Sequence, residues 1–498
     1  MRIPLSELVL ESLESNLNAD LPAHRRIFEL IRQAILSHQL QGGSKLPSSR
    51  NLASEIGCSR NTIIAAYEQL LAEGYVESRI GRGTVVADTL PSYSLISQSV
   101  RADNTTNEEL INLPRVLSRR GKKLTQSPSD RNFEIQEFIA GANDFSVFPY
   151  KLWQKLQNKC WREPQSAFMD YARQGGYQPL REVLAEYLRV SRSVRVSAEQ
   201  ILITAGTQQS LDLCTLLLAD SGDMAWMENP GYWGARRIFE ASDLQLRPIA
   251  VDAEGMAPSQ ADLATSPRLI YATPSHQYPT DVVMSLTRRR LLIEFAAAKG
   301  AWILEDDYDS EFRYKGRPIA SLQGLDNHDR VIYLGTFSKV LYPGIRIGYV
   351  VVPKDLIEPF RTGLLDIHRP GQMAVQAALA DFISQGHFAT HIRNVRSRYG
   401  QSRALLQYTL QNQLLAPAYL SNADAGLHLV VHLPDYCDDV KLVAEARLQQ
   451  IDIRPLSAYY IAPPVTRGVV VGYGYMPLGK IVEAAMRLAT LVNKHIVV

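Results

Sequence analysis

One short run of the sequence combines an amine, two hydroxyls and a guanidinium. Within Gly335–Tyr349 these groups belong to Lys339, Thr336, Ser338 and Arg346. A lysine amine forms a Schiff base with an aldehyde, whereas hydroxyls and a guanidinium bind phosphate. An aldehyde and a phosphate are the two ends of pyridoxal 5'-phosphate (PLP), so the run predicts a site for this cofactor.

Two further groups that PLP requires follow an apolar run at 302–305. Because α/β sites are built at the carboxyl ends of strands, Asp306 is placed to pair with the pyridine nitrogen and Tyr308 to hydrogen-bond the phenolate oxygen. In the turn Asn229–Tyr232, Tyr232 offers a ring that could stack on the cofactor. Each such group is common by itself, but their joint occurrence favours PLP binding.

The other half of the expected phosphate site is a turn that follows one strand and opens a helix. It contains Gly206, Thr207 and Gln208, whose free amides and hydroxyls suit a phosphate at a helix N-terminus. Ser338 and Arg346 would complete this cradle. No metal site is predicted, because no cysteine pair has metal-ligand spacing.

The elements that must position these residues follow an α/β pattern from Phe133 onward. Helical patterns alternate there with short apolar runs, which predict strands at 200–204, 268–272, 302–305 and 331–334. Such runs favour a mostly parallel sheet that is covered on both faces. From about Phe360, a long helical pattern, strands at 426–431 and 469–473 and a final helix predict a smaller α+β subdomain.

The first 88 residues follow a different plan, with three helical segments and a β-hairpin. Apolar spacing predicts a helix over 23–39, a second helix capped by Ser48 or Ser49, and a third capped by Ser59. Short β-type runs at 75–78 and 83–86 surround Gly81-Arg82-Gly83, which is a hairpin signal.

The start of the third helix carries side chains that suit DNA. Arg60 can pair with guanine and Asn61 with adenine in a major groove, and a helix N-terminus also favours phosphate. Arg50 could clamp a phosphate, and Arg82 at the hairpin tip could enter a minor groove. A solvated surface would explain Arg60 alone but not the ordered set. The predicted DNA-binding residues are Arg50, Ser59, Arg60, Asn61, Thr62 and Arg82.

Residues 89–131 lack both periodicities and carry a basic block within 112–123. We interpret this stretch as a linker, so the predicted domains are 1–88, 89–131 and 132–498. The basic block is compatible with a solvated segment or with a supplementary DNA contact.

Length and composition limit the number of domains, the source of any DNA contact, the use of disulfides and the expected location. A chain of 498 residues predicts at least two domains. The net charge is only +2, so any DNA contact depends on local clustering. The four cysteines form no CxxC pair, which excludes a disulfide framework. Without a signal peptide or an apolar run of about 20 residues, a cytoplasmic protein without membrane contact is expected.

The N-terminal motifs resemble the winged helix-turn-helix of the GntR family. The matching stretches are Leu46–Ala53, Ser59–Ile63, Tyr67–Leu70, Gly74–Val76 and Gly81–Thr84. The rest of the chain resembles fold-type I aminotransferases, because the phosphate turn, stacking aromatic, Asp and Lys come in the same order. The stretches Gly176–Arg181 and Thr273–Thr280 add to that match. This resemblance implies a homodimer in which Tyr171 reaches the phosphate bound by the partner subunit.

Together the two halves resemble the MocR subgroup of the GntR family, whose members join a winged helix to an aminotransferase-like domain through a long linker. Asp144–Pro149 also resembles that subgroup's entry to the PLP domain. The resemblance implies a PLP-dependent transcriptional regulator that binds double-stranded promoter DNA, with each DNA-binding head packed near the other protomer's PLP domain. A Schiff base between PLP and Lys339 would sense PLP itself, an amine or an amino acid, and would change DNA affinity or promoter geometry.

Two departures from the aminotransferase pattern argue against efficient transamination. The position at which an arginine usually grips the substrate carboxylate holds Val470, with Arg454 and Arg467 as candidate substitutes. The usual Asn-Pro-Thr-Gly turn is replaced by Tyr278–Asp281. The alternatives are an active aminotransferase with an accessory DNA-binding module, and a DNA-binding protein whose PLP domain is only a dimerising scaffold.

Overall fold

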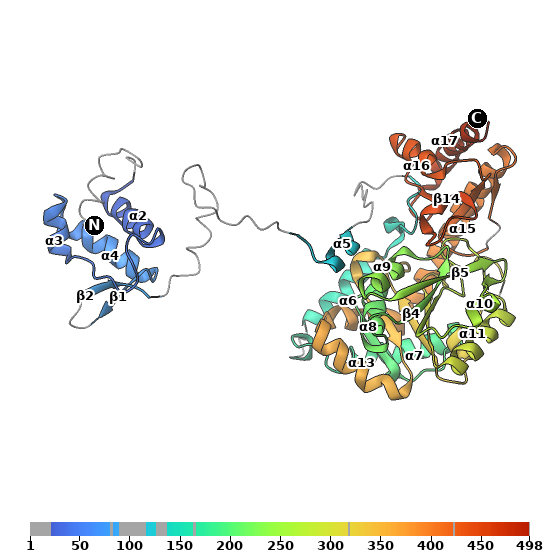
Figure 1. Ribbon diagram of the computed structural model, residues 1–498, viewed down its shortest axis with the longest axis horizontal. Helices are drawn as coiled ribbons and strands as arrows, with labels where there is room; N and C mark the ends of the chain where they lie inside the picture. The colour runs from blue at the N-terminus through green and yellow to red at the C-terminus, as the bar shows by residue number, and fades with distance from the viewer. Residues whose placement is uncertain are drawn as a thin grey trace. The chain divides into compact units, whose positions relative to one another are not determined.

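The computed structural model describes residues 21–79, 83–88, 116–125, 137–162, 166–316, 319–421 and 424–497. The chain divides after Pro114 into two units (Figure 1). Within the described residues, no helix has the combination of length and apolar character that crossing a membrane requires.

The first unit is a three-helix core with a hairpin. Its helices are α2 (Ala23–Leu36), α3 (Ser49–Glu55) and α4 (Arg60–Ala72), and its antiparallel strands are β1 (Val76–Arg79) and β2 (Gly83–Val86). The apolar residues spaced for one helical face are those that meet in the core, among them Ile31, Leu52, Ile63 and Leu70. The predicted winged helix-turn-helix fold is confirmed. The first helix ends at Leu36, three residues before the predicted end, because His38 adopts a positive φ of 60°.

The second unit is built on an eight-stranded sheet with the order β3-β10-β9-β8-β7-β4-β5-β6. Four pairings are parallel, whereas β10 is antiparallel to both of its neighbours and β6 is a short antiparallel edge strand. The predicted, mostly parallel sheet is therefore confirmed. Its strands are β3 (Ile201–Thr204), β4 (Met224–Asn229), β5 (Gln245–Asp252), β6 (Gly255–Met256), β7 (Leu269–Ala272), β8 (Trp302–Asp307), β9 (Val331–Thr336) and β10 (Gly348–Val351).

Helices cover both faces of this sheet, as the strand β7 shows. Leu269 and Tyr271 pack with side chains of α8 (Thr207–Leu218), α9 (Trp233–Ala241) and α13 (Ile357–Gly363), whereas Ile270 and Ala272 pack against α11 (Leu286–Lys299). Because successive side chains of a strand point to opposite faces, a continuous apolar run is buried only in such a three-layer arrangement. The other helices of this part are α5 (Arg119–Thr125), α6 (Tyr150–Arg162), α7 (Gln178–Arg192), α10 (Gln260–Leu263), α12 (Leu322–Leu325) and α14 (Met373–Ser384).

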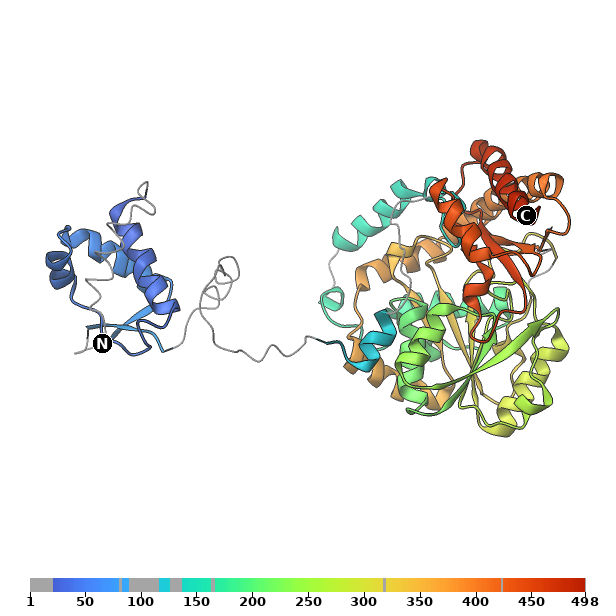
Figure 2. The ribbon, with the colours of Figure 1, turned by 45° about the horizontal axis from the view of Figure 1, so that its top comes forward.

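The C-terminal part of this unit forms the smaller α+β subdomain that the sequence predicts. A four-stranded antiparallel sheet has the order β11-β12-β14-β13, with strands Tyr419–Leu420, His428–Leu433, Arg467–Gly472 and Arg454–Pro455 respectively. It packs with α15 (His387–Gln413), α16 (Asp439–Leu448) and α17 (Leu478–Ile496), drawn in orange and red in Figure 2.

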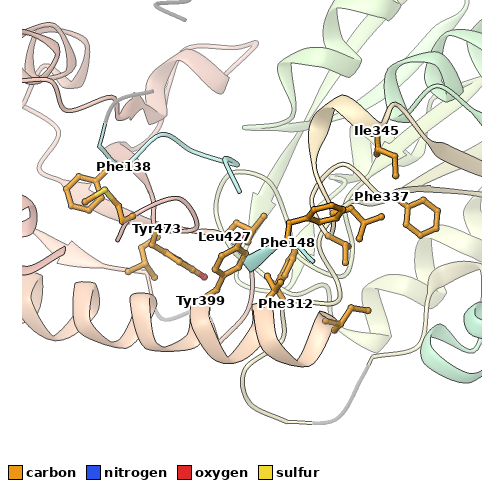
Figure 3. Close-up of a cluster of buried hydrophobic side chains, with 14 of the residues drawn as sticks. Phe138, Phe148, Phe312, Phe337, Ile345, Tyr399, Leu427 and Tyr473 are labelled. Carbon is orange, nitrogen blue, oxygen red and sulfur yellow. The ribbon is translucent and has the colours of Figure 1, made fainter. Parts of the chain in front are cut away.

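A shared aromatic core joins this subdomain to the large sheet (Figure 3). Tyr399 of α15 packs on Phe312, with ring centroids 5.4 Å apart. Phe337, which precedes Lys339 by two residues, is buried in the same cluster. The lysine segment is therefore anchored from both parts of the unit.

Candidate functional site

A cavity of about 310 Å³ lies at the carboxyl ends of β7, β8 and β9 and at the start of α8 and α9. Nine of the ten predicted cofactor residues line it: Gly206, Thr207, Gln208, Tyr232, Asp306, Tyr308, Ser338, Lys339 and Arg346. The tenth, Tyr171, is 48% exposed and lies outside the cavity, with the Arg369 guanidinium 5.9 Å from its ring centroid. Its predicted role toward a partner subunit stays a prediction.

The amine of Lys339 points into this cavity and donates a hydrogen bond to the Gly141 carbonyl oxygen at 2.9 Å. Gly141 has a φ of 75°, which favours glycine, and a Cβ atom there would lie 2.7 Å from Lys339 Nζ, so a larger residue would displace the amine from this position. Burial lowers the pKa of Lys339, although Asp309 and Asp306 oppose this shift. A lowered pKa enlarges the neutral fraction of the amine, which is the form that attacks an aldehyde.

The backbone around Lys339 is held by a residue that the sequence did not single out. Asn143 Nδ2 donates hydrogen bonds to the carbonyl oxygens of Lys339 (2.7 Å) and Leu341 (3.3 Å). Gly141 and Asn143 immediately precede Asp144–Pro149, the segment that resembles the entry to the PLP domain. That proximity was the only available signal for them.

Asp306 has the properties that a partner of a protonated pyridine nitrogen needs. It is 4% exposed, and its Oδ2 accepts a hydrogen bond from the Tyr271 hydroxyl at 2.7 Å. Its Oδ1 is buried without a hydrogen-bond partner in the described parts of the chain. Burial and the nearby Asp307 and Asp309 raise the pKa of Asp306 to about 7. A cationic ring nitrogen would supply the missing donor and favour the carboxylate, so the residue fits PLP.

The phosphate end of the cavity combines a helix N-terminus with a guanidinium. Gly206 precedes α8 with a φ of 110°, and Thr207 is the first residue of that 12-residue helix. Arg346 and Ser338 line the same cavity. Within the ranges that the structure describes, no ion pair or side-chain hydrogen bond is made by the Arg346 guanidinium. A cation beside free helix amides suits a phosphate.

Tyr232 stands at the entrance to α9 and is fixed in two ways. Gln208 Nε2 donates a hydrogen bond to the Tyr232 hydroxyl at 3.0 Å. A Cβ atom on Gly234 would lie 2.5 Å from the Tyr232 ring, so the ring can lie over the first turn of α9 only because residue 234 is glycine. This places a rigid aromatic wall on the cavity, as stacking on a cofactor ring requires.

The DNA-binding candidates lie on the first unit, at the start of α3 and α4. Ser59 Oγ caps α4 by accepting a hydrogen bond from the Thr62 amide at 3.2 Å, and the two hydroxyls lie 2.8 Å apart. These two residues are engaged in forming the turn, whereas Arg60 and Asn61 are exposed on it. Arg50 is exposed in the first turn of α3. Arg82 lies outside the described residues.

Comparison with known proteins agrees with both halves. Residues 23–86 match the family "Bacterial regulatory proteins, gntR family", and residues 140–467 match "Aminotransferase class I and II". The chain is 38% identical to the "Probable rhizopine catabolism regulatory protein MocR" of Rhizobium meliloti, over 92% of this chain and 91% of that protein. It is 30% identical to the "HTH-type pyridoxine biosynthesis transcriptional regulator PdxR" of Corynebacterium glutamicum, over 90% and 91%.

The chain belongs to the MocR subgroup of the GntR family. It is a PLP-dependent, DNA-binding transcriptional regulator. The solved structures that it resembles include a kynurenine aminotransferase of Pyrococcus horikoshii, with 27% identity, a TM-score of 0.67 and coverage of 75% of this chain and 93% of that one. A multiple substrate aminotransferase of Thermococcus profundus gives 25% identity, a TM-score of 0.69 and coverage of 76% and 98%.

This MocR-type regulator lacks the usual guanidinium for a substrate carboxylate among its described cavity residues. Val470 is fully buried in β14. Arg467 pairs with Asp439 at 3.3 Å and Arg454 with Asp452 at 3.2 Å, and neither lines the cavity. Arg346 is the one arginine of the described lining.

Proposed function

We propose that the cavity of this regulator is its sensor, and that occupancy of the cavity changes how the N-terminal unit binds DNA. The observation that carries the proposal is a set of incomplete groups around one cavity. Lys339 has a depressed pKa, Asp306 has a buried oxygen without a partner, and Arg346 has no counter-ion among the described residues. PLP would complete all three.

Each group of cavity residues is proposed to bind a different part of PLP. Lys339 would bind the aldehyde, Asp306 the ring nitrogen and Tyr308 the phenolate oxygen, while Tyr232 stacks on the ring. Gly206, Thr207, Gln208, Ser338 and Arg346 would hold the phosphate. When bound, PLP supplies an electrophilic carbon and an electron-accepting ring.

The effector is proposed to be PLP itself or an amine, rather than an α-amino acid. Arg346 is assigned to the phosphate, and the described lining offers no second guanidinium to bind a carboxylate bidentately. An effector acts only if it binds the two DNA-affinity states unequally.

The functional assembly is proposed to be a homodimer on promoter DNA. Tyr171 of one protomer would reach the phosphate that the partner holds. Two heads would read two half-sites, with Arg60 and Asn61 at base edges and Arg50 at a phosphate. The domain boundaries at 88 and 131 belong to this proposal, and α5 (Arg119–Thr125) lies within the proposed linker.

The test is DNA binding by cofactor-free and PLP-loaded protein at fixed salt, with the promoter next to the protein's own gene as DNA. Absorbance at about 400–430 nm on the same samples reports cofactor attached through lysine. Loading should produce the band and change DNA affinity. Lys339→Ala should abolish both effects, whereas the matched control Lys354→Ala, at an exposed lysine, should preserve them. A band in Lys339→Ala would refute the lysine assignment.

A second candidate function is transamination, which the similarity to solved aminotransferases above 25% identity favours. Sustained production of a keto acid at about 1 per second or faster would establish it. Turnover far below that rate, together with PLP-dependent DNA binding, would support the regulator alone.

A further inference from the structure

A buried cluster of charged and titratable side chains lies directly behind Tyr308. His276 Nδ1 lies 3.0 Å from the Tyr308 hydroxyl oxygen and 2.8 Å from Asp309 Oδ2. On the other side of the ring, His276 Nε2 lies 3.2 Å from Asp281 Oδ1. The side chains of His276, Asp281 and Asp309 are each 1% exposed.

This geometry favours the charged form of His276. Nδ1 is hydrogen-bonded to Asp309, and Nε2 lies near Asp281 Oδ1 without hydrogen-bond geometry. A neutral imidazole would turn one lone pair toward one of these carboxylates. Burial alone disfavours charge, but Asp309 and Asp281 outweigh it and raise the pKa of His276 to about 10. Burial likewise opposes charge on Asp281, yet His428 and His276 hold its pKa well below the usual range.

A charged His276 constrains where the Tyr308 proton can point. With both ring nitrogens protonated, Nδ1 has no lone pair and can only donate. The Tyr308 oxygen can therefore share this single N–H with the nearer Asp309 Oδ2 but cannot donate to Nδ1. Among the described residues, His276 is the one hydrogen-bond partner of the Tyr308 hydroxyl, so its O–H is free to point into the cavity that Tyr308 lines.

We propose that His276, clamped as a cation between Asp309 and Asp281, is a positioning residue that directs the Tyr308 hydroxyl proton into the cavity, toward the ring oxygen of PLP. The inference rests on the proposed contact between Tyr308 and the cofactor. It also gives a reason for the departure at position 281, where aminotransferases usually have glycine.

The surroundings are shaped to hold this clamp. Gly426 has a φ of 87°, and a Cβ atom there would lie 2.0 Å from His276 Cε1, so no larger residue fits. Asp281 keeps the left-handed φ of 65° that suits a glycine turn. Ser421 Oγ donates to Asp281 Oδ2 at 2.7 Å, and His428 Nε2 lies 2.8 Å from Asp281 Oδ1. Ser421 and His428 come from the C-terminal subdomain, so the clamp joins that subdomain to the cofactor side of the sheet.

The clamp is tested by the pH dependence of the visible absorbance of PLP-loaded protein. That absorbance reports protonation of the nitrogen that joins the cofactor to Lys339. A donor to the neighbouring ring oxygen disperses its negative charge and disfavours the protonated nitrogen. Losing that donor therefore raises the pH at which half of this nitrogen is deprotonated, which is the pH midpoint of the absorbance change. The other titratable groups around the clamp and cavity, unchanged in each variant, are His428, His432, Tyr278, Tyr314, Tyr473, Asp306 and Lys339.

Four variants separate positioning from a general structural effect. Tyr308→Phe should raise the midpoint, and His276→Gln should raise it by about half to one pH unit, the equivalent of one hydrogen bond. The double variant should match Tyr308→Phe alone, because His276 acts through the hydroxyl. Asp281→Asn, which tolerates the left-handed turn, should give a smaller shift in the same direction.

Several results would overturn the inference. A midpoint that does not move in loaded His276→Gln would do so, and so would a His276→Gln shift that persists in full beside Tyr308→Phe. If His276→Gln does not fold, Asp281→Asn decides: a raised midpoint supports the clamp and an unchanged one refutes it. Wild-type protein without any visible band would overturn the proposed cofactor site together with the clamp.

Discussion

The two units of this regulator expose and bury their functional groups in opposite ways. On the first unit, Arg60 and Asn61 stand on an exposed helical turn that Ser59 caps. In the second unit, Asp306 and the clamp around His276 are buried, where an unpaired charge is costly. A DNA surface gains from freely solvated groups because the ligand is large and brings its own charge. A cofactor site must instead keep groups incomplete until a small molecule arrives.

The largest expected effect concerns the buried carboxylate. Asp306→Asn would remove the proposed charge partner of the ring nitrogen, and losing one partner of a buried pair costs about 3–5 kcal/mol. The affinity for PLP should fall by about a hundred-fold or more, as measured by absorbance titration. The control Asp435→Asn changes an exposed carboxylate and should leave the affinity unchanged. Equal affinities in the two variants would contradict the assignment of Asp306 to the ring nitrogen.

Although Asp306→Asn should weaken PLP binding, it should stabilise the cofactor-free protein against unfolding. Asp306 has a pKa raised to about 7 from 3.8, so the folded state resists its ionisation. Below pH 3.8 the residue is protonated in both states and contributes no penalty. The penalty grows as the pH rises from 3.8 to about 7 and is constant above that range. Cofactor-free Asp306→Asn should therefore unfold at a higher temperature than wild type at pH 8. A variant that is less stable at pH 8 would contradict this sign.

Independence of the two units can be tested through the core of the first. Ile63 is fully buried in α4, and Ile63→Ala should destabilise that unit by about 2–5 kcal/mol. DNA binding should be lost on heating at a lower temperature, while the visible band of PLP-loaded protein melts as in wild type. Leu71→Ala, at a 47% exposed position on the same helix, is the control and should change neither. A simultaneous loss of both signals would show that the units unfold together.

The sequence could predict features that depend on neighbouring residues or on strand ends, but not the individual contacts between side chains. The cap at Ser59 and the turn that follows it depend on neighbouring residues, so a local pattern was sufficient. The strand ends that carry Asp306 and Lys339 were also predictable, because parallel strands bring their carboxyl ends to one edge. The contacts of Gly141 with Lys339 and of His276 with Asp281 and Gly426 were not. The contacts of Gly141 with Lys339 and of Gly426 with His276 join segments that lie far apart in the sequence, whereas that of His276 with Asp281 depends on the shape of the turn between them. All three depend on ångström-level space, to which hydrophobic periodicity is insensitive.

A smaller effect distinguishes base reading from phosphate binding within the first unit. Arg60→Ala should weaken specific DNA binding by about 1–3 kcal/mol at fixed salt and leave nonspecific binding nearly unchanged. Arg50→Ala should weaken both kinds of binding and reduce the salt dependence. Competition binding with specific and random DNA measures the difference. Unchanged discrimination in Arg60→Ala would exclude a base contact for that side chain.

The smallest expected effect lies on α5, near the start of the second unit. Lys123 of α5 forms an ion pair with Asp243 at 2.9 Å, just after α9, and both side chains are well exposed (46% and 68%). Solvent and salt weaken such a pair, so Lys123→Ala, Asp243→Ala and the double variant should show almost no coupling in thermal unfolding, and none at 1 M salt. Arg237 of α9 also donates to the Leu124 carbonyl oxygen at 3.0 Å and lies 5.8 Å from the ring of Trp233, which lines the cavity. A large, salt-resistant coupling would therefore mean that α5 is held firmly against α9, the helix that contributes to the cavity wall.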